Sequence, residues 1–241
     1  VYKRQAMDGF DLLILGFMLS LISGDLGLTT GQAGSLVTWT LVGAVIGGFI
    51  FGTLSDKFGR VRVLTWTIVL FAVFTGLCAF AQGYWDLLIY RTIAGIGLGG
   101  EFGIGMALAA EAWPAQHRAK ATSYVAIGWQ LGVLAAALLT PVLLPYIGWR
   151  GMFMVGIIPA FVAWFFRAKL HEPEIFVQSK EIKEHSHTNS FKLLVKDVRT
   201  TKTSIGVAIL TSVQNFGYYG IMIWLPNFLS KQLGFSLTKS G

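Results

Sequence analysis

The chain has little charge, one cysteine and few histidines. Asp, Glu, Lys and Arg together make up 13% of its 241 residues, about half the share of a soluble protein, and the mean hydropathy is +0.63. This composition excludes a soluble domain of this length. A single cysteine excludes a disulfide framework, and four histidines without a helical His-x-x-x-His pair offer no metal site. No metal or other cofactor is expected.

Long apolar runs are what the chain has instead. Most are close to the roughly 20 residues that a tilted helix needs to cross a bilayer, so we interpret them as seven membrane-spanning helices. They lie near residues 9–24, 33–52, 63–82, 85–110, 121–145, 150–168 and 203–226. The sequence therefore predicts an all-α, multi-pass protein that resides in a lipid bilayer.

Basic residues concentrate on one side of these runs. The segments 53–62, 111–120 and 167–202 hold three, two and eight Lys or Arg residues, whereas the connections on the other side hold only Arg150. By the positive-inside rule, the N-terminus and the segment 167–202 are cytoplasmic. The formal charge of +7 therefore reflects topology, and its spread over several loops argues against a nucleic-acid partner.

The turn between the second and third runs carries the most informative motif. Residues 52–62 read GTLSDKFGRVR, with four ionic groups within seven residues. These groups must lie at the membrane surface, because isolated charge is costly inside a bilayer. The pattern resembles the loop between the second and third helices of the major facilitator superfamily, roughly G-x-L-[AS]-D-[RK]-x-G-R-[RK]-x-x-L, from which only Val61 departs.

This resemblance implies a fold and a domain plan. Transporters of this superfamily have two six-helix bundles joined by a cytoplasmic linker. We therefore expect an N-terminal six-helix transmembrane bundle at residues 1–168, the linker at 169–202, and the truncated start of the second bundle, with its seventh helix, at 203–241. On this interpretation the chain is an N-terminal fragment of a carrier that is monomeric when full length.

Two acids open the first run in the order Asp-Gly-Phe-Asp. The spacing of Asp8 and Asp11 puts both carboxylates on one side of a helix. Asp11 is followed directly by apolar residues, so its charge should be partly desolvated, as proton coupling requires; Asp8 can instead simply cap the helix. This start resembles the aromatic-acid and related metabolite:proton symporters of the superfamily, which implies H⁺ as the coupling ion.

An arginine and a glutamate interrupt the fourth run. Arg91 resembles the fourth-helix arginine of the superfamily, which is implicated in proton transfer or substrate binding. Glu101 follows two glycines, as in sialate, lactate and other organic-acid symporters, and is a second candidate for proton coupling. The alternatives are a structural ion pair of Arg91 with Asp86 or Glu101, and a role for the repeated glycines of 95–105 in close helix packing.

Charged residues reappear where the fourth run ends. Glu111 and Arg118 resemble an E-x(6)-R element that, in the family, joins the turn at 52–62 in an ion-pair cluster. The resemblance implies a cytoplasmic gate that is closed by this cluster and opens when it breaks; the alternative is that the charges only establish topology. The predicted gate consists of Gly52, Asp56, Gly59, Arg60, Arg62, Glu111 and Arg118.

Amides and phenols within apolar runs usually face a cavity. Gln130 lies in the fifth run, and Asn215, Tyr218 and Tyr219 lie in the seventh. Together with Arg91 they form the predicted substrate-binding set. The two tyrosines can instead belong to an aromatic belt at the membrane interface.

These residues favour proton-coupled symport of a small organic anion by alternating access, in a bacterial inner membrane. Arg91 would attract the carboxylate, while Asp11 or Glu101 carries the proton. Within transport, the alternative is a sugar or other neutral-metabolite porter, and a sensor that keeps the carrier fold is a further possibility. A membrane-embedded enzyme ranks far below, because no histidine lies within a predicted span to serve as a base.

Overall fold

The computed structural model describes residues 2–167, 196–225 and 228–229. Most of the predicted linker at 169–202 lies outside these residues, as do three of the four histidines. Within the described ranges the regular elements are all helical, and they are α1 (Tyr2–Asp25), α2 (Thr30–Phe58), α3 (Arg60–Cys78), α4 (Tyr84–Glu111), the short η1 (Ala115–His117), α5 (Arg118–Arg167), α8 (Val198–Tyr219) and the π-helical turn η2 (Gly220–Trp224).

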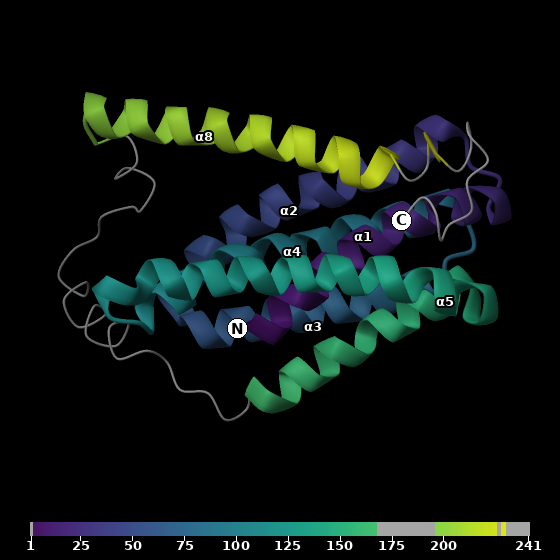
Figure 1. Cartoon of the computed structure of the whole chain (residues 1–241), viewed down its shortest axis with the longest axis horizontal. Coiled ribbons are helices and arrows are strands. Elements are labelled where there is room, and N and C mark those ends of the chain that lie inside the picture. The colour runs from purple at the N-terminus through teal and green to yellow at the C-terminus, as the bar shows by residue number, and fades with distance from the viewer. Residues whose placement is uncertain (1, 168–195, 226–227, 230–241) are drawn as a thin grey trace.

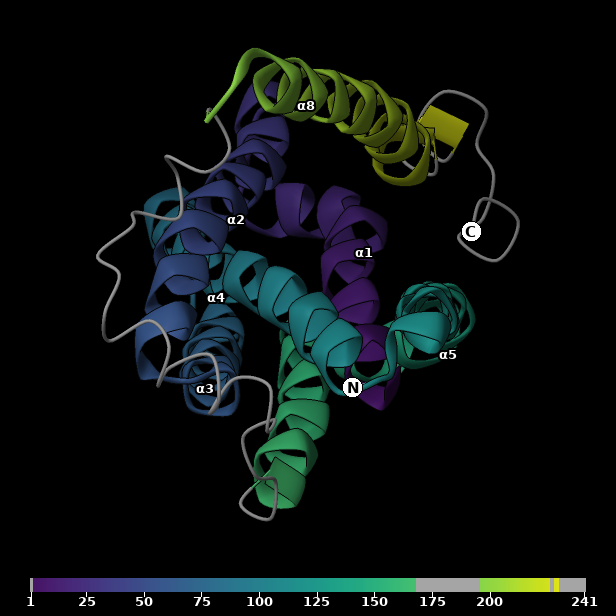
Figure 2. The ribbon, with the colours of Figure 1, turned by 90° about the vertical axis from the view of Figure 1, so that its left-hand side faces the viewer.

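The long helices run side by side along the molecule (Figure 1). Among the described residues, four helical segments are long and apolar enough to cross a membrane, namely α2, α3, α4 and the stretch 115–157. The predicted all-α membrane fold is confirmed. The turns that carry the basic residues 53–62 and 111–120 lie at one end of the bundle, which we call the basic end and which faces the viewer in Figure 2.

The fifth and sixth predicted runs form the two arms of α5. These arms meet at Gly148, where φ is 65° and ψ is 177°. Glycine alone adopts such a positive φ readily, so the chain reverses direction at a single residue (Figure 1). The apolar runs therefore predicted both arms, while the loop expected between them is reduced to one glycine.

The first helix is the centre of the bundle. Residues Leu12–Leu15 are at most 2% exposed, and Met18 and Ile22 are fully buried. A helix that is apolar on every side is normally surrounded by others, and α1 packs mainly against α5. Any polar side chain on this part of α1 is therefore placed in the core.

Helices α2 and α4 cross with their backbones in direct contact. A methyl group on Gly47 of α2 would overlap the carbonyl of Ile96, and one on Gly99 of α4 would overlap the carbonyl of Ala44. Small residues permit this approach in membrane helices. The prediction that the glycines of the fourth run serve helix packing is thus confirmed at Gly99.

Helix α8 lies along one side of the bundle, next to α2 and α1 (Figures 1 and 2). It begins at Val198, earlier than the apolar run at 203, because Asp197 caps its first turn. The Asp197 carboxylate accepts a hydrogen bond from the Thr200 N–H at 2.8 Å, and this bond holds the pKa of Asp197 below its ordinary value. Most of α8 is exposed, and its end meets α1 through η2.

Candidate functional site

A buried ion pair joins α1 to α4. The Arg91 guanidinium donates through Nη1 to Oδ2 of Asp11 at 2.8 Å, and the two side chains are only 1% and 3% exposed. The ring of Phe153, from the second arm of α5, lies 4.7 Å from the guanidinium carbon, close enough for a cation–π contact. The pair is therefore enclosed by three helices of one bundle.

The partner of Arg91 differs from those named in the alternative interpretation. That alternative was an ion pair with Asp86 or Glu101, whereas Arg91 pairs with Asp11, because α1 runs through the core beside α4. The Asp86 carboxylate accepts the N–H of Gln82 at 3.2 Å, near the start of α4. Two residues that were assigned separate tasks, one for the proton and one for the substrate, are in direct contact.

This pair leaves much of its hydrogen-bonding capacity unused. In the described part of the chain, Nε and Nη2 of Arg91 and Oδ1 of Asp11 have no hydrogen-bond partner. Buried polar atoms are nearly always paired, and leaving one unpaired is costly. An incompletely satisfied pair in the core is thus a candidate site for a ligand or a proton.

The other two proton-coupling candidates lie elsewhere. Glu101 is on α4 and only 4% exposed, and its ten-residue separation from Arg91 corresponds to about 15 Å along the helix. Asp8 lies on α1, and its side chain is outside the described residues. Of the two candidate acids whose side chains the structure describes, Asp11 is the one in contact with the buried arginine.

A polar contact between α5 and α8 brings two predicted binding residues together. The indole Nε1 of Trp129 donates to the Tyr218 hydroxyl at 3.2 Å, and that hydroxyl donates to Oε1 of Gln130 at 3.5 Å. The neighbouring Tyr219 packs against the core cluster of Leu12 and its surroundings. These aromatic and amide groups offer both flat surfaces and neutral hydrogen-bonding groups to a small molecule.

The sequence predicted that Asn215 shares a binding face with Tyr218, but in the structure it is Trp129 that contacts Tyr218. Asn215 is exposed on α8, so the spacing of three from Tyr218 did not bring it into this contact. Trp129 was not a candidate, although an indole N–H beside an amide in an apolar run was the signal available. The pattern identified the helices, but not which side chains meet.

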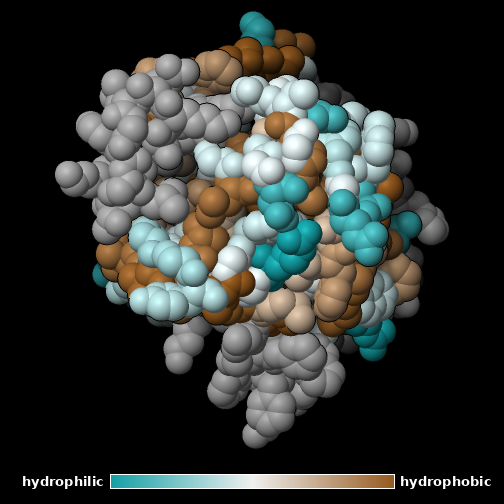
Figure 3. Space-filling model, turned by 90° about the vertical axis from the view of Figure 1, so that its right-hand side faces the viewer, coloured by the Kyte–Doolittle hydropathy of each residue, from teal (hydrophilic) through white to brown (hydrophobic). Residues whose placement is uncertain are grey.

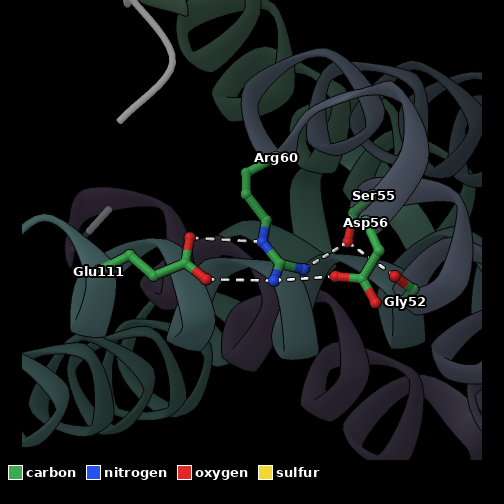
Figure 4. Close-up of polar contacts among 5 residues, drawn as sticks. All are labelled: Gly52, Ser55, Asp56, Arg60 and Glu111. Carbon is green, nitrogen blue, oxygen red and sulfur yellow. Dashed lines mark hydrogen bonds and ion pairs between the residues drawn. The ribbon is translucent and has the colours of Figure 1, made fainter. Parts of the chain in front are cut away.

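At the basic end, Arg60 forms a second ion-pair cluster (Figure 4). Its Nη2 lies 2.9 Å from Oδ1 of Asp56 and 3.1 Å from Oε1 of Glu111, and its Nε donates to the other Glu111 oxygen at 3.3 Å. Its Nη1 donates to the Ser55 hydroxyl at 2.8 Å, which in turn donates to the carbonyl of Gly52. The cluster ties α2 and α3 to the end of α4.

The remaining predicted gate residues differ in their contacts. Gly59 has a φ of 106° and is the only residue between α2 and α3, so it places Arg60 at the first position of α3. A methyl group on Gly52 would meet nothing within 4 Å. Arg62 is exposed, and Nε of Arg118 donates to the carbonyl of Trp113 at 3.4 Å. Direct ion pairs among Asp56, Arg60 and Glu111 are thus present within the predicted set, and the carbonyl of Gly52 accepts from the Ser55 hydroxyl that Arg60 contacts.

A third arginine–carboxylate pair lies at the opposite end of the bundle. Asp25 accepts hydrogen bonds from Nη1 of Arg150 at 2.7 Å and from the Trp149 indole at 3.0 Å, while Arg150 also donates to the carbonyl of Ala81. The two hydrogen bonds hold the pKa of the Asp25 carboxyl below its ordinary value. Hydrophilic residues gather over part of this end, among hydrophobic ones (Figure 3).

No group of three His, Cys, Asp or Glu side chains that could hold a metal ion occurs within the described ranges.

Known sequences resemble this chain along nearly its whole length. A family described as the Major Facilitator Superfamily matches residues 5–241. A protein of Haemophilus influenzae, named only for metabolite transport, is 79% identical over 98% of this chain. A "Probable 4-methylmuconolactone transporter" of Cupriavidus pinatubonensis is 37% identical over 96% of it, and a cis,cis-muconate transport protein of Acinetobacter baylyi is 34% identical over 95%. The chain spans 59%, 54% and 56% of the length of these relatives.

Among solved structures, a D-xylose-proton symporter superposes with a TM-score of 0.77, at 23% identity, over 99% of this chain and 62% of the symporter. At this identity the likeness concerns the fold alone.

Proposed function

Because the chain belongs to the major facilitator superfamily, a family of multi-pass membrane transporters, we propose that it is part of a carrier that takes up a small organic anion together with a proton. The carrier works by alternating access of two bundles, of which residues 1–168 form one. Relatives named for muconate and 4-methylmuconolactone transport support an organic acid as substrate. All of the relatives reported above are named for transport, and no enzymatic activity is proposed.

The observation that carries this proposal is the buried pair of Asp11 and Arg91. As it stands, the pair is neutral: one carboxylate faces one guanidinium at 2.8 Å. When Asp11 takes up a proton, Arg91 keeps a positive charge without a partner, and an uncompensated buried charge is strongly unfavourable. A substrate carboxylate then restores neutrality. Protonation and anion binding favour each other, which is the coupling that symport needs.

The geometry of Arg91 suits a carboxylate ligand. Its Nε and Nη2 are unpaired and lie on one edge of the planar guanidinium, and such an edge binds a carboxylate through two parallel hydrogen bonds. In the described state Arg91 is only 1% exposed, so substrate reaches it after the helices around it move. Trp129, Gln130 and Tyr218 then contact the rest of the substrate through ring faces and neutral polar groups.

A proton fits this site better than a sodium ion. One oxygen of Asp11 already accepts from Arg91 at 2.8 Å, and a bound metal cation would lie close to the guanidinium charge. At such separations like charges repel by several kcal/mol in the poorly solvated core. Protonation of Asp11 avoids this repulsion, because the added proton bonds to the carboxylate itself and no second cation has to lie beside the guanidinium.

The ion-pair cluster at the basic end is the proposed cytoplasmic gate. Its charges are partly exposed, and they connect three helices where the bundle meets the cytoplasm in the proposed orientation. The N-terminus is then also cytoplasmic, and the membrane is a bacterial inner membrane. Gly52, Arg62 and Arg118 are proposed parts of the same gate.

The proposal is tested by reconstituting the full-length protein in liposomes and following external pH while small carboxylates are added. Solute-dependent alkalinisation is expected. The variant Asp11→Asn should lose proton-driven accumulation but keep exchange of labelled solute across the membrane, because the site then resembles its protonated form permanently.

The matched control is Asp86→Asn, which removes an acid at the start of α4, away from Arg91. It should retain accumulation. Accumulation that persists in Asp11→Asn would contradict the assignment of the proton to Asp11. A pH change produced by a neutral sugar would favour the alternative, a sugar or other neutral-metabolite porter.

A further inference from the structure

The second oxygen of Asp11 takes no part in the ion pair with Arg91. Asp11 Oδ1 has no hydrogen-bond partner among the described residues, and neither has the hydroxyl of Thr75 on α3, whose exposure is 0%. The side chains of Asp11 and Thr75 both lie next to Gly156, on the second arm of α5. A methyl group built on Gly156 would be 3.5 Å from Asp11 Oδ1 and 3.5 Å from Cγ2 of Thr75.

The unpaired hydroxyl of Thr75 departs from the behaviour of other threonines in the same helices. Thr65 and Thr67 of α3 and Thr92 of α4 each donate to a backbone carbonyl three or four residues earlier, at 2.7 to 2.8 Å. That local bond is the ordinary way in which a helix satisfies a threonine. Because Thr75 does not make it, its hydroxyl is available to a group in the bundle interior.

Two buried polar atoms without a protein partner, on side chains that flank one glycine, point to an ordered water. Buried polar groups that the protein itself does not pair are commonly satisfied in this way. A buried water needs two to four polar partners, and Asp11 Oδ1 and the Thr75 hydroxyl supply two. The apolar residues that line α1 on either side supply none, so the polar groups define where the water is held.

The charges around this position are those of the ion pair and one thiol. Arg91 contributes the guanidinium from α4, and Cys78 lies near both charged groups from α3. The Cys78 thiol donates to the carbonyl of Phe74 at 3.2 Å, which keeps it within its own helix. From α5, the residue next to Asp11 Oδ1 is the uncharged Gly156.

We propose that Thr75 and Gly156 hold one water against Asp11 Oδ1, and that protons reach and leave Asp11 through it. A proton that arrives on this water as hydronium forms the Oδ1–H bond and leaves neutral water, and the reverse step releases it. Thr75 is a positioning residue: its hydroxyl orients the water and donates to it or accepts from it. This inference rests on the proposed role of Asp11 as proton carrier.

The first test compares two substitutions of Thr75 in the full-length protein. Thr75→Val keeps the shape and removes the hydroxyl, while Thr75→Ser keeps the hydroxyl. Because the oriented water favours the ionised carboxylate, Thr75→Val should move the midpoint of the pH dependence of uptake to higher pH, by about one pH unit. Thr75→Ser should restore the wild-type midpoint. A shift of equal size in both variants would show a packing effect and overturn the proposal.

The second test adds a methyl group beside Asp11 without changing a polar residue. Gly156→Ala places this methyl group 3.5 Å from Asp11 Oδ1, where it would hinder the approach of a water to that oxygen. It should reproduce the shift of Thr75→Val without lowering thermal stability. A wild-type midpoint in Gly156→Ala would overturn the proposal.

A spectroscopic measurement separates this inference from the proposed function. The infrared carbonyl band of protonated Asp11 is identified by its loss in Asp11→Asn. It should lie at higher frequency in Thr75→Val than in the wild type, because the acid loses a hydrogen-bonded neighbour. If transport is not proton-coupled but the band still shifts, the water site stands and the symport assignment fails. A band unchanged by Thr75→Val overturns the water site whatever the transport assays show.

Discussion

Arg91 in the core and Arg60 at the basic end each face carboxylates, but they are satisfied to opposite degrees. Arg60 uses Nε, Nη1 and Nη2, with two acids and a serine as partners, and its side chain is 17% exposed. Arg91 uses Nη1 alone, with one acid, and its side chain is 1% exposed. The more deeply buried cation therefore has fewer partners, which is the reverse of what stability alone would favour.

This difference fits the two proposed roles, a gate at the basic end and a ligand site in the core. Buried ion pairs contribute little net stability, because the cost of desolvation offsets the attraction between the charges. Removing one partner strongly destabilises the folded state, because it leaves the other charge buried and unpaired. A fully bonded, partly hydrated arginine can connect helix ends at small cost and can separate again in water. The unused donors of Arg91 have no comparable structural purpose, which supports a ligand-binding role in the core.

The largest expected effect comes from removing the buried cation. Arg91→Ala leaves the Asp11 carboxylate buried without its partner, and should destabilise the bundle by about 3–5 kcal/mol and abolish uptake. Thermal unfolding of the full-length protein in detergent measures the first effect. Adding Asp11→Ala should recover much of the stability, since no lone charge remains. A double variant as unstable as Arg91→Ala would mean that packing, not charge, holds this site.

An intermediate effect is expected at the basic end. Arg60→Lys keeps the positive charge, but the compact ammonium of lysine cannot reach Ser55, Asp56 and Glu111 at the same time. The free energy of unfolding should therefore fall by about 1 kcal/mol. Arg118→Lys loses one long hydrogen bond to a carbonyl and should reduce stability less. Thermal unfolding compares the two variants. An equal loss of stability in both would mean that Arg118 also belongs to the ion-pair cluster. High salt should reduce the loss in Arg60→Lys and leave that in Arg91→Ala nearly unchanged.

The smallest effect is expected for the pair at the opposite end, Asp25 and Arg150, whose side chains are 48% and 46% exposed. The folded-state pKa of Asp25 is lowered, so its ionised form contributes stability above the ordinary pKa, and this contribution is lost as pH falls through the lowered value. Asp25→Asn should therefore lower the melting temperature slightly at neutral pH. A deficit that stays the same below the ordinary pKa would show that the contact is not electrostatic.

Sequence patterns predicted which segments are helical better than where those helices begin and turn. Apolar length was sufficient to find both arms of α5, but the single-residue reversal at Gly148 depends on a positive φ that no hydropathy pattern contains. The early start of α8 at Val198 follows from capping by Asp197, a side-chain contact outside the apolar run. Both differences come from local hydrogen bonding and backbone geometry rather than from hydrophobicity.

The same holds for the candidate site. Asp11 and Arg91 were each identified because a charge in an apolar run is costly, and Asp56, Arg60 and Glu111 because the motif resembles a known one. That Asp11 is the partner of Arg91, separated by 80 positions, could not be read from either helix alone. Trp129 was missed for the same reason, since its importance lies in a contact with Tyr218 on another helix.

By itself, the sequence determined that this chain is a helical membrane protein with a basic end and a few costly charges in its spans. Hydropathy and charge act residue by residue, so they can be read in one dimension. Only the tertiary structure decided which charges neutralise one another, because that depends on how helices cross, and here the glycine contact of α2 with α4 and the central path of α1 place Asp11 beside Arg91. The ion pair is a property of the packing, although each of its charges is visible in the sequence.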